Sequence, residues 1–153
     1  MYFSCNFNFL VFQIFNGILQ YRFNCGSGEG TVVIPLLVSD GKWHTILVER
    51  HGNIAELILD DKYSSMAKSP GTNDVLDLRT NHVYFGAEVE IYNGFDDIRH
   101  GFEGCMENIR LYNVRLPFDG SNAVAVDLEF KSLQFHCKDS YQGPLGTSKY
   151  CLI

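Results

Sequence analysis

Apolar and polar residues alternate along several short stretches of the chain, and this period of two predicts β-strands rather than helices. Between residues 19 and 23, every second side chain is Leu, Tyr or Phe, and Gln and Arg lie between them. One face of this stretch is therefore expected to be buried. Asn16 and Gly17 separate it from an apolar run at residues 9–15, and this pair favours a tight hairpin because both residues tolerate a positive φ.

The same pattern recurs through the rest of the chain. Further strands are expected at residues 31–37, where Pro35 should break the strand, and at 43–50, 54–60, 75–78, 82–87, 105–111, 128–130 and 133–137. In the strand at 54–60, Ala55, Leu57 and Leu59 share one face. Residues 64–73 are polar and contain Ser69-Pro70-Gly71, so they are expected to form a loop. Short strands separated by turn signals at intervals of about 8–12 residues indicate an all-β fold, here an antiparallel β-sandwich.

The composition narrows the class of protein further. The 153 residues are enough for one domain with a substantial core. Aromatic residues make up 14% of the chain, which suits a globular β-protein. The net charge of −6 argues against a nucleic-acid partner, because phosphate binding needs a basic surface. Residues 1–21 carry no formal charge, but Asn and Gln interrupt their apolar run, so they predict neither a signal peptide nor a membrane span.

The cysteines and histidines form no recognisable metal motif. Five cysteines occur, at positions 5, 25, 105, 137 and 151. No two have the CxxC spacing of zinc ribbons or thioredoxin-like sites. Because their number is odd, at least one is expected to be free or paired outside this chain. The five histidines are scattered without metal-ligand spacing, so structural or surface roles are expected for them.

One pair of carboxylates has a spacing that occurs in catalytic sites. Glu88 and Glu90 are two residues apart, which places two acids on one face of a strand, as in jelly-roll glycosidases. The third acidic position expected of such a strand is occupied by Asn93 or its neighbours. No nucleophile motif of the G-x-S-x-G kind occurs. The chain is therefore predicted not to be an enzyme.

Three segments, in this order and spacing, resemble a laminin G-like domain over about residues 9–137. They are Phe23–Gly28 (FNCGSG), Asp40–Arg50 (DGKWHTILVER) and Phe102–Leu111 (FEGCMENIRL), and Cys137 follows the third segment. The sequence of the third segment looks most like the laminin G modules of invertebrate-type neural cadherins, and Fat-like cadherins come second.

The resemblance implies a concanavalin-like jelly-roll sandwich with a disulfide between Cys105 and Cys137. That bridge would close a loop of about thirty residues and stabilise the domain by roughly 3 kcal/mol. It also implies an oxidising compartment. Trp43 lies at strand spacing with Thr45 and Leu47, so we expect it to anchor the core rather than to stack on a ligand.

The resemblance also implies a calcium site, because many laminin G-like domains hold one Ca²⁺ at a rim. Glu29 is the best match to the first acidic ligand, and Asp77 to the second. Backbone carbonyls near Thr45 and Leu76 would complete the set. Calcium binds oxygen ligands, and water molecules can complete its coordination shell where the protein supplies only some of them.

The predicted organisation is an atypical segment at residues 1–8, a laminin G-like domain at 9–137 whose first strands are missing, and a linker or tail at 138–153. By resemblance, the domain is a non-enzymatic extracellular module of a membrane-anchored, calcium-dependent, cadherin-type adhesion receptor. That receptor would contact a protein partner on the surface of neighbouring cells, with homophilic contact between two such receptors as one form of this adhesion. The alternative is a matrix or glycan-binding module of a secreted or basement-membrane protein, although the basic residues are few and dispersed.

Overall fold

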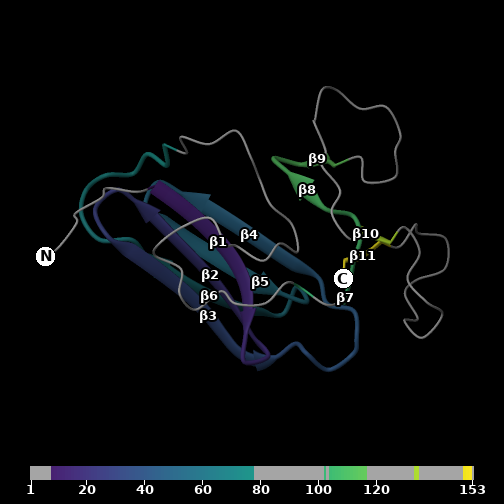
Figure 1. Cartoon of the computed structure of the whole chain (residues 1–153). Helices are drawn as coiled ribbons and strands as arrows, with labels where there is room; N and C mark the ends of the chain where they lie inside the picture. The colour runs from purple at the N-terminus through teal and green to yellow at the C-terminus, as the bar shows by residue number, and fades with distance from the viewer. Residues whose placement is uncertain (1–7, 78–101, 103, 117–132, 135–149, 153) are drawn as a thin grey trace, which may run out of the picture. The chain divides into compact units, whose positions relative to one another are not determined.

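The computed structural model describes residues 8–77, 102, 104–116, 133–134 and 150–152. The chain divides into two compact units, Met1–His82 and Val83–Ile153 (Figure 1). All regular elements among the described residues are β-strands. None of these residues forms a helix long and apolar enough to cross a membrane.

The first sheet contains three antiparallel strands in the order β1-β2-β3, which are β1 (Asn8–Phe15), β2 (Ile18–Cys25) and β3 (Glu29–Leu37) (Figure 1). Asn16 and Gly17 join β1 to β2 with φ values of 51° and 77°. Two positive φ values in a two-residue loop match the right-handed twist of the strands. The hairpin predicted from the Asn-Gly pair is confirmed.

Pro35 does not end β3, although the sequence suggested a break there. The strand continues to Leu37. The pairing register shifts in the partner strand β2, between Ile18 and Leu19. Proline lacks a backbone N–H and is tolerated on edge strands and at bulges. β3 is an edge strand of its sheet in the described part of the chain, so it accommodates this residue.

The second sheet of the first unit has the order β4-β5-β6, with β4 at Ile46–His51, β5 at Ile54–Leu59 and β6 at Tyr63–Lys68. The loop predicted at residues 64–73 is wrong over β6, which pairs with β5 along its whole length. The strand was not predicted because it contains two serines and ends in a charged residue. An edge strand can expose polar side chains while its backbone bonds to one neighbour.

The core of the first unit lies between these two sheets. Its buried members are Leu19, Tyr21, Phe23, Cys25, Val32, Ile34, Val38, Ala55, Leu57 and Leu59. All except Val38, which directly follows β3, come from alternate positions of β2, β3 and β5, which is the packing of a sandwich. Complete burial of each large apolar side chain stabilises the fold by about 1.5–3 kcal/mol. The strand faces predicted from the alternation in β2 and β5 are confirmed.

Trp43 does not lie on a strand, because β4 begins only at Ile46. The side chain is half-buried and outside the buried core, and its buried Nε1 atom has no hydrogen-bond acceptor among the described residues. The prediction of a strand from residue 43 was therefore wrong. Before β4, side-chain carboxylates bond backbone N–H groups that a strand would use for pairing. Asp40 Oδ1 accepts the backbone N–H of Lys42 at 3.0 Å, and Asp60 Oδ1 accepts the backbone N–H of Thr45 at 2.9 Å.

The second unit contains short strands in its described part. Its sheet has the order β10-β11-β7, with β7 at Gly104–Met106, β10 at Leu133–Gln134 and β11 at Tyr150–Leu152, and β8 (Arg110–Leu111) forms a hairpin with β9 (Val114–Arg115). The strand predicted at 105–111 is interrupted after Met106, and Asn108 has a φ of 51°. β11 lies within the segment predicted to be a linker or tail. The predictions for residues 82–87 and 128–130, and Glu88 and Glu90, lie outside the described residues.

Candidate functional site

Glu29, the first expected calcium ligand, begins β3 opposite Asn24 of β2. Its carboxylate forms a two-point ion pair with Arg22, at 2.7 Å from Nε to Oε1 and 3.0 Å from Nη2 to Oε2. The Thr31 hydroxyl also donates to Oε1 at 2.9 Å. Both oxygen atoms are thus engaged, and a cation at Glu29 would have to displace the guanidinium group.

Asp77, the second expected ligand, is exposed in a stretch without regular structure after β6. The Thr45 carbonyl, an expected backbone ligand, accepts the N–H of Asp60 at 2.8 Å. Within the described stretches, no three or more His, Cys, Asp and Glu side chains are placed to hold a metal ion. The described geometry therefore does not offer a formed calcium site, and calcium binding at Glu29 and Asp77 stays a prediction.

Residues 69–73 hold the loops at this end of the first unit together. Ser69 is completely buried, and its hydroxyl donates to the Gly28 carbonyl at 2.7 Å. Its backbone N–H donates to the Asn53 carbonyl at 2.8 Å. The Asn53 side chain in turn donates to the carbonyls of Ser69 and Gly71, at 3.2 and 3.0 Å. Three loops far apart in sequence are thus joined in one polar network.

The glycine loop between β2 and β3 is shaped by asparagines. Asn24 Oδ1 accepts the backbone N–H groups of Gly26 at 2.7 Å and Gly28 at 3.2 Å. Asn73 Nδ2 donates to the Cys25 carbonyl across the loop. Sequence reasoning identified the glycines but missed these asparagines. The available signal was an Asn directly before a Gly-rich turn, since Asn side chains often bond to backbone N–H groups two residues further on.

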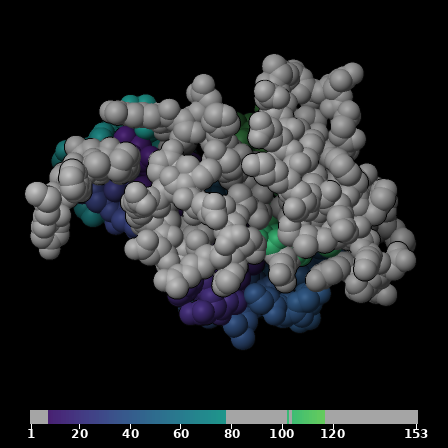
Figure 2. All heavy atoms as spheres, in the orientation of Figure 1, coloured from purple at the N-terminus to yellow at the C-terminus, as the bar shows by residue number. Residues whose placement is uncertain are grey.

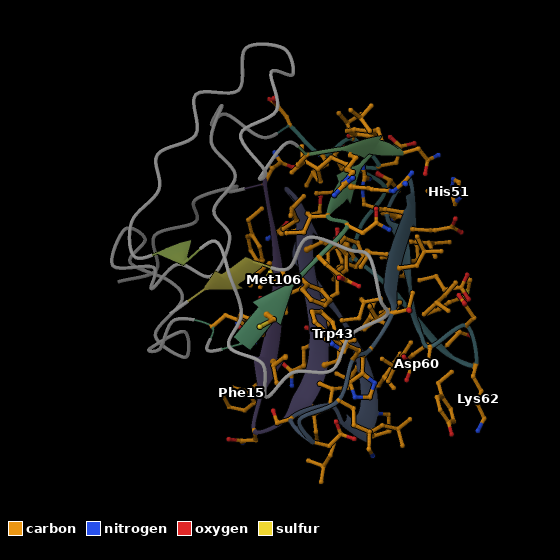
Figure 3. The ribbon with its side chains drawn as sticks, turned by 90° about the vertical axis from the view of Figure 1, so that its right-hand side faces the viewer. Phe15, Trp43, His51, Asp60, Lys62 and Met106 are labelled. Carbon is orange, nitrogen blue, oxygen red and sulfur yellow. The ribbon has the colours of Figure 1, made fainter. Side chains whose placement is uncertain are left out.

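His44 bridges two carboxylates from different parts of the chain, an arrangement that we call the aspartate–histidine clasp (Asp40, His44 and Asp60). Nδ1 lies 2.9 Å from Asp60 Oδ2, and Nε2 lies 3.1 Å from Asp40 Oδ1. The His44 side chain is 17% exposed. Asp60 and Asp61 form the turn from β5 to β6, with φ values of 56° and 53°. Figure 3 labels Asp60, with Trp43 to its left and Lys62 to its right in this view.

The clasp changes the acidity of its members. The bond to Asp60 raises the pKa of His44, and the bond to Asp40 adds to this effect, while partial burial opposes both. The same bond lowers the pKa of Asp60. The pKa of Asp40 is lowered first by the Lys42 ammonium, which lies 2.8 Å from its Oδ2. Because each ring nitrogen faces a carboxylate, only the imidazolium form can donate to both.

β1 leaves part of its apolar surface open. Leu10, Phe12 and Ile14 lie on the same face of the sheet as the core residues of β2, with which they pair. Their side chains nevertheless remain 42%, 43% and 37% exposed. Part of the first hairpin, in purple, reaches the molecular surface in Figure 2. The sandwich core is thus only partly covered along this strand.

The family model for the laminin G domain matches residues 1–114, about three quarters of the chain. The chain belongs to the laminin G domain family. Its antiparallel sheets are accordingly part of a jelly-roll sandwich, as predicted. The match begins at residue 1 and so includes the segment at 1–8.

Curated relatives of this laminin G domain include two Fat-type proteins. The Fat-like cadherin-related tumor suppressor homolog of Drosophila melanogaster is 37% identical over 92% of the chain, which covers 3% of that protein. Protocadherin Fat 1 of Homo sapiens is 36% identical over 73% of the chain and 2% of its own length. Pikachurin of Rattus norvegicus is 28% identical over 76% of the chain and 12% of its own length. The chain thus spans only a small part of each relative.

These relatives sharpen the interpretation of the sequence. The two cadherin relatives are of the Fat type, which the third segment suggested as second to the neural cadherins. The laminin G domain is a non-enzymatic module, in agreement with the prediction from Glu88 and Glu90, which themselves lie outside the described residues.

Cys105 is disulfide-bonded. Cys137 lies outside the described residues, so its pairing with Cys105 stays a prediction.

Proposed function

We propose that this laminin G domain is a recognition module in the extracellular part of a cadherin-type adhesion receptor. The observation that carries the proposal is the 37% identity to a Fat-like cadherin-related protein over 92% of the chain. The disulfide at Cys105 supports an extracellular location, because such bonds persist in oxidising compartments. The parent receptor would be anchored in the plasma membrane and would contact a protein on a neighbouring cell.

The rim of the first unit has the rigidity that such a role requires. The loops at residues 26–28, 52–53 and 69–73 are joined by the hydrogen bonds of Ser69, Asn53 and Asn73. Loops that are fixed before binding lose little conformational entropy when they meet a partner. The rim can therefore present a defined surface, in the manner of other β-sandwich recognition domains.

We also expect the rim loops to bind calcium. Glu29 and Asp77 would supply carboxylate oxygens, and the Arg22 guanidinium would leave Glu29 when the cation binds. The competition with Arg22 predicts weak affinity at most, because the existing two-point ion pair must first be broken. Isothermal calorimetry of the wild type and of Asp77→Ala tests this, and equal heats for both would remove Asp77 from the site.

A matrix or glycan-binding role is the second candidate, because the relatives of this laminin G domain include pikachurin, whose name does not mark it as a cadherin. Sulfated glycans are bound by clustered basic side chains that are free to meet sulfate groups. In this domain Arg22 is paired with Glu29, and Lys42 with Asp40. Two of the cations in the described part of the chain are therefore already neutralised, which favours the protein-binding role.

A bead assay separates the two roles. The purified chain, with its disulfide intact, is attached to fluorescent beads, which are mixed with each other and with cultured epithelial cells. The adhesion role predicts adhesion that survives excess heparin and is absent from beads coated with a Phe23→Asp chain, whose core is disrupted. Adhesion abolished by heparin, together with retention on a heparin column at about 0.15 M salt, would replace it by glycan binding.

A further inference from the structure

A hollow of about 440 Å³ lies between β3 and β6, away from the rim loops. It is lined by Val33, Ile34, Pro35 and Leu36 of β3 and by Lys62, Tyr63, Ser64 and Ser65 at the start of β6. β3 pairs only with β2, and β6 only with β5, among the described residues. The hollow therefore opens between the end of β3 and the start of β6, two neighbouring strand edges that form no backbone ladder with each other.

The two walls differ in chemistry. The β3 wall is apolar, and Leu36 is 37% exposed there. On the β6 wall, Tyr63 is 39% exposed, and the Lys62 ammonium lies 4.7 Å from the centre of its ring. This contact holds the cation at the mouth of the hollow. The ion pairs among the described residues include neither Lys62 nor the adjacent Asp61, and Asp60 is already bound to His44.

We propose that this hollow binds an extended peptide segment of a partner protein, with apolar residues against β3 and an acidic residue on Lys62. The peptide would add a strand to β6, since Pro35 deprives β3 of one N–H donor at this position. Its apolar side chains would meet Pro35 and Leu36, which are exposed, and its carboxylate would meet the Lys62 ammonium. The inference rests on the proposed adhesion role and adds a surface separate from the rim.

The shape and charge favour a peptide over a glycan. A sulfated glycan carries several charges and needs several cations, whereas Lys62 is the single cation among the described residues of the lining. An apolar wall next to unpaired backbone edges is the combination used for strand addition, in which main-chain hydrogen bonds give affinity and alternate pockets give specificity.

The test uses the whole chain and a fluorescein-labelled peptide of sequence Val-Asp-Val-Thr-Val-Asp-Val-Thr, measured by fluorescence anisotropy. We expect saturable binding that falls about tenfold in Lys62→Glu and weakens with salt. Lys68→Glu is the matched control, because Lys68 has the same charge at the other end of β6 and does not line the hollow. It should leave the affinity within twofold.

Two modified peptides test the mode of binding. Replacing both aspartates by lysines should abolish binding to the wild type. N-methylation of one alternate set of backbone amides should abolish binding, and methylation of the other set should not, because only one set faces β6. Equal binding of the acidic and basic peptides, equal effects of Lys62→Glu and Lys68→Glu, no saturable binding, or displacement by heparin would each overturn the proposal.

The bead assay distinguishes this failure from failure of the adhesion role. If beads carrying Lys62→Glu adhere to cells like wild-type beads and the peptide does not bind, the hollow is excluded and the adhesion role stands. If wild-type beads do not adhere, the adhesion role fails whatever the peptide result.

Discussion

His44 donates to two carboxylates from separate turns, so replacing it by alanine should loosen the connection between the segment before β4 and the turn after β5. A hydrogen bond between charged groups contributes about 1.5–3 kcal/mol when buried. His44 is 17% exposed and Asp60 is 38% exposed, so solvent screening reduces the contribution of this bond to about 1 kcal/mol. His44→Ala should lower the free energy of unfolding by about that amount at pH 5.5.

The pH dependence gives the sharper test. The raised pKa of His44 means that the clasp contributes fully below the ordinary value of 6.5 and is lost as pH rises through the folded-state pKa. The lowered pKa of Asp60 means that its contribution is present above the ordinary value of 3.8 and is lost as pH falls through the folded-state pKa. The difference between wild type and His44→Ala should therefore be largest between about pH 4 and pH 6.5.

Urea denaturation at pH 5.5 and pH 8.5 measures this difference, and an NMR titration of His44 should give a pKa above 6.5. His51→Ala is the control, because His51 is an exposed residue at the end of β4, and its removal should have a small effect. An equal or larger loss for His44→Ala at pH 8.5 than at pH 5.5 would refute the role of the imidazolium form.

The turns and the rim give three more tests. Asp61→Gly should raise the free energy of unfolding by up to about 1 kcal/mol, because φ at Asp61 is 53° and glycine adopts it without cost. Gly30→Ala should lower the thermal midpoint, with a cost of about 1–3 kcal/mol, since its Cβ would lie 2.8 Å from the backbone nitrogen of Ser69. Arg22→Ala should increase the calorimetric heat of calcium binding by freeing Glu29, and an unchanged heat would exclude Glu29 as a ligand.

Local features of the fold were predictable from the sequence. The Asn16-Gly17 turn depends on two adjacent residues, and the buried face of β5 depends on alternation within six residues. β6 was missed because two serines replace the apolar residues that mark a strand, and its pairing with β5 comes from the neighbouring strand rather than from its own composition. An edge strand gives a weak sequence signal for this reason.

The site was less predictable, because its contacts join distant residues. The clasp requires Asp40 and Asp60 both to contact His44. Neither contact can be predicted from the alternation of apolar and polar residues. The ion pair of Arg22 with Glu29 depends on the Asn24–Glu29 register between β2 and β3, which places the two side chains diagonally across the pair of strands. The laminin G resemblance identified the rim, but it could not show that Glu29 is already engaged.

Cys25 supplies a natural probe for the opening of the first unit. Its thiol is free and fully buried in the core. A disulfide-exchange reagent can reach it only when the strands around it separate, so the labelling rate, compared with that of a Cys25→Ala chain, reports the free energy of that opening. The same shielding should keep Cys25 reduced in the oxidising surroundings where the disulfide of Cys105 is maintained.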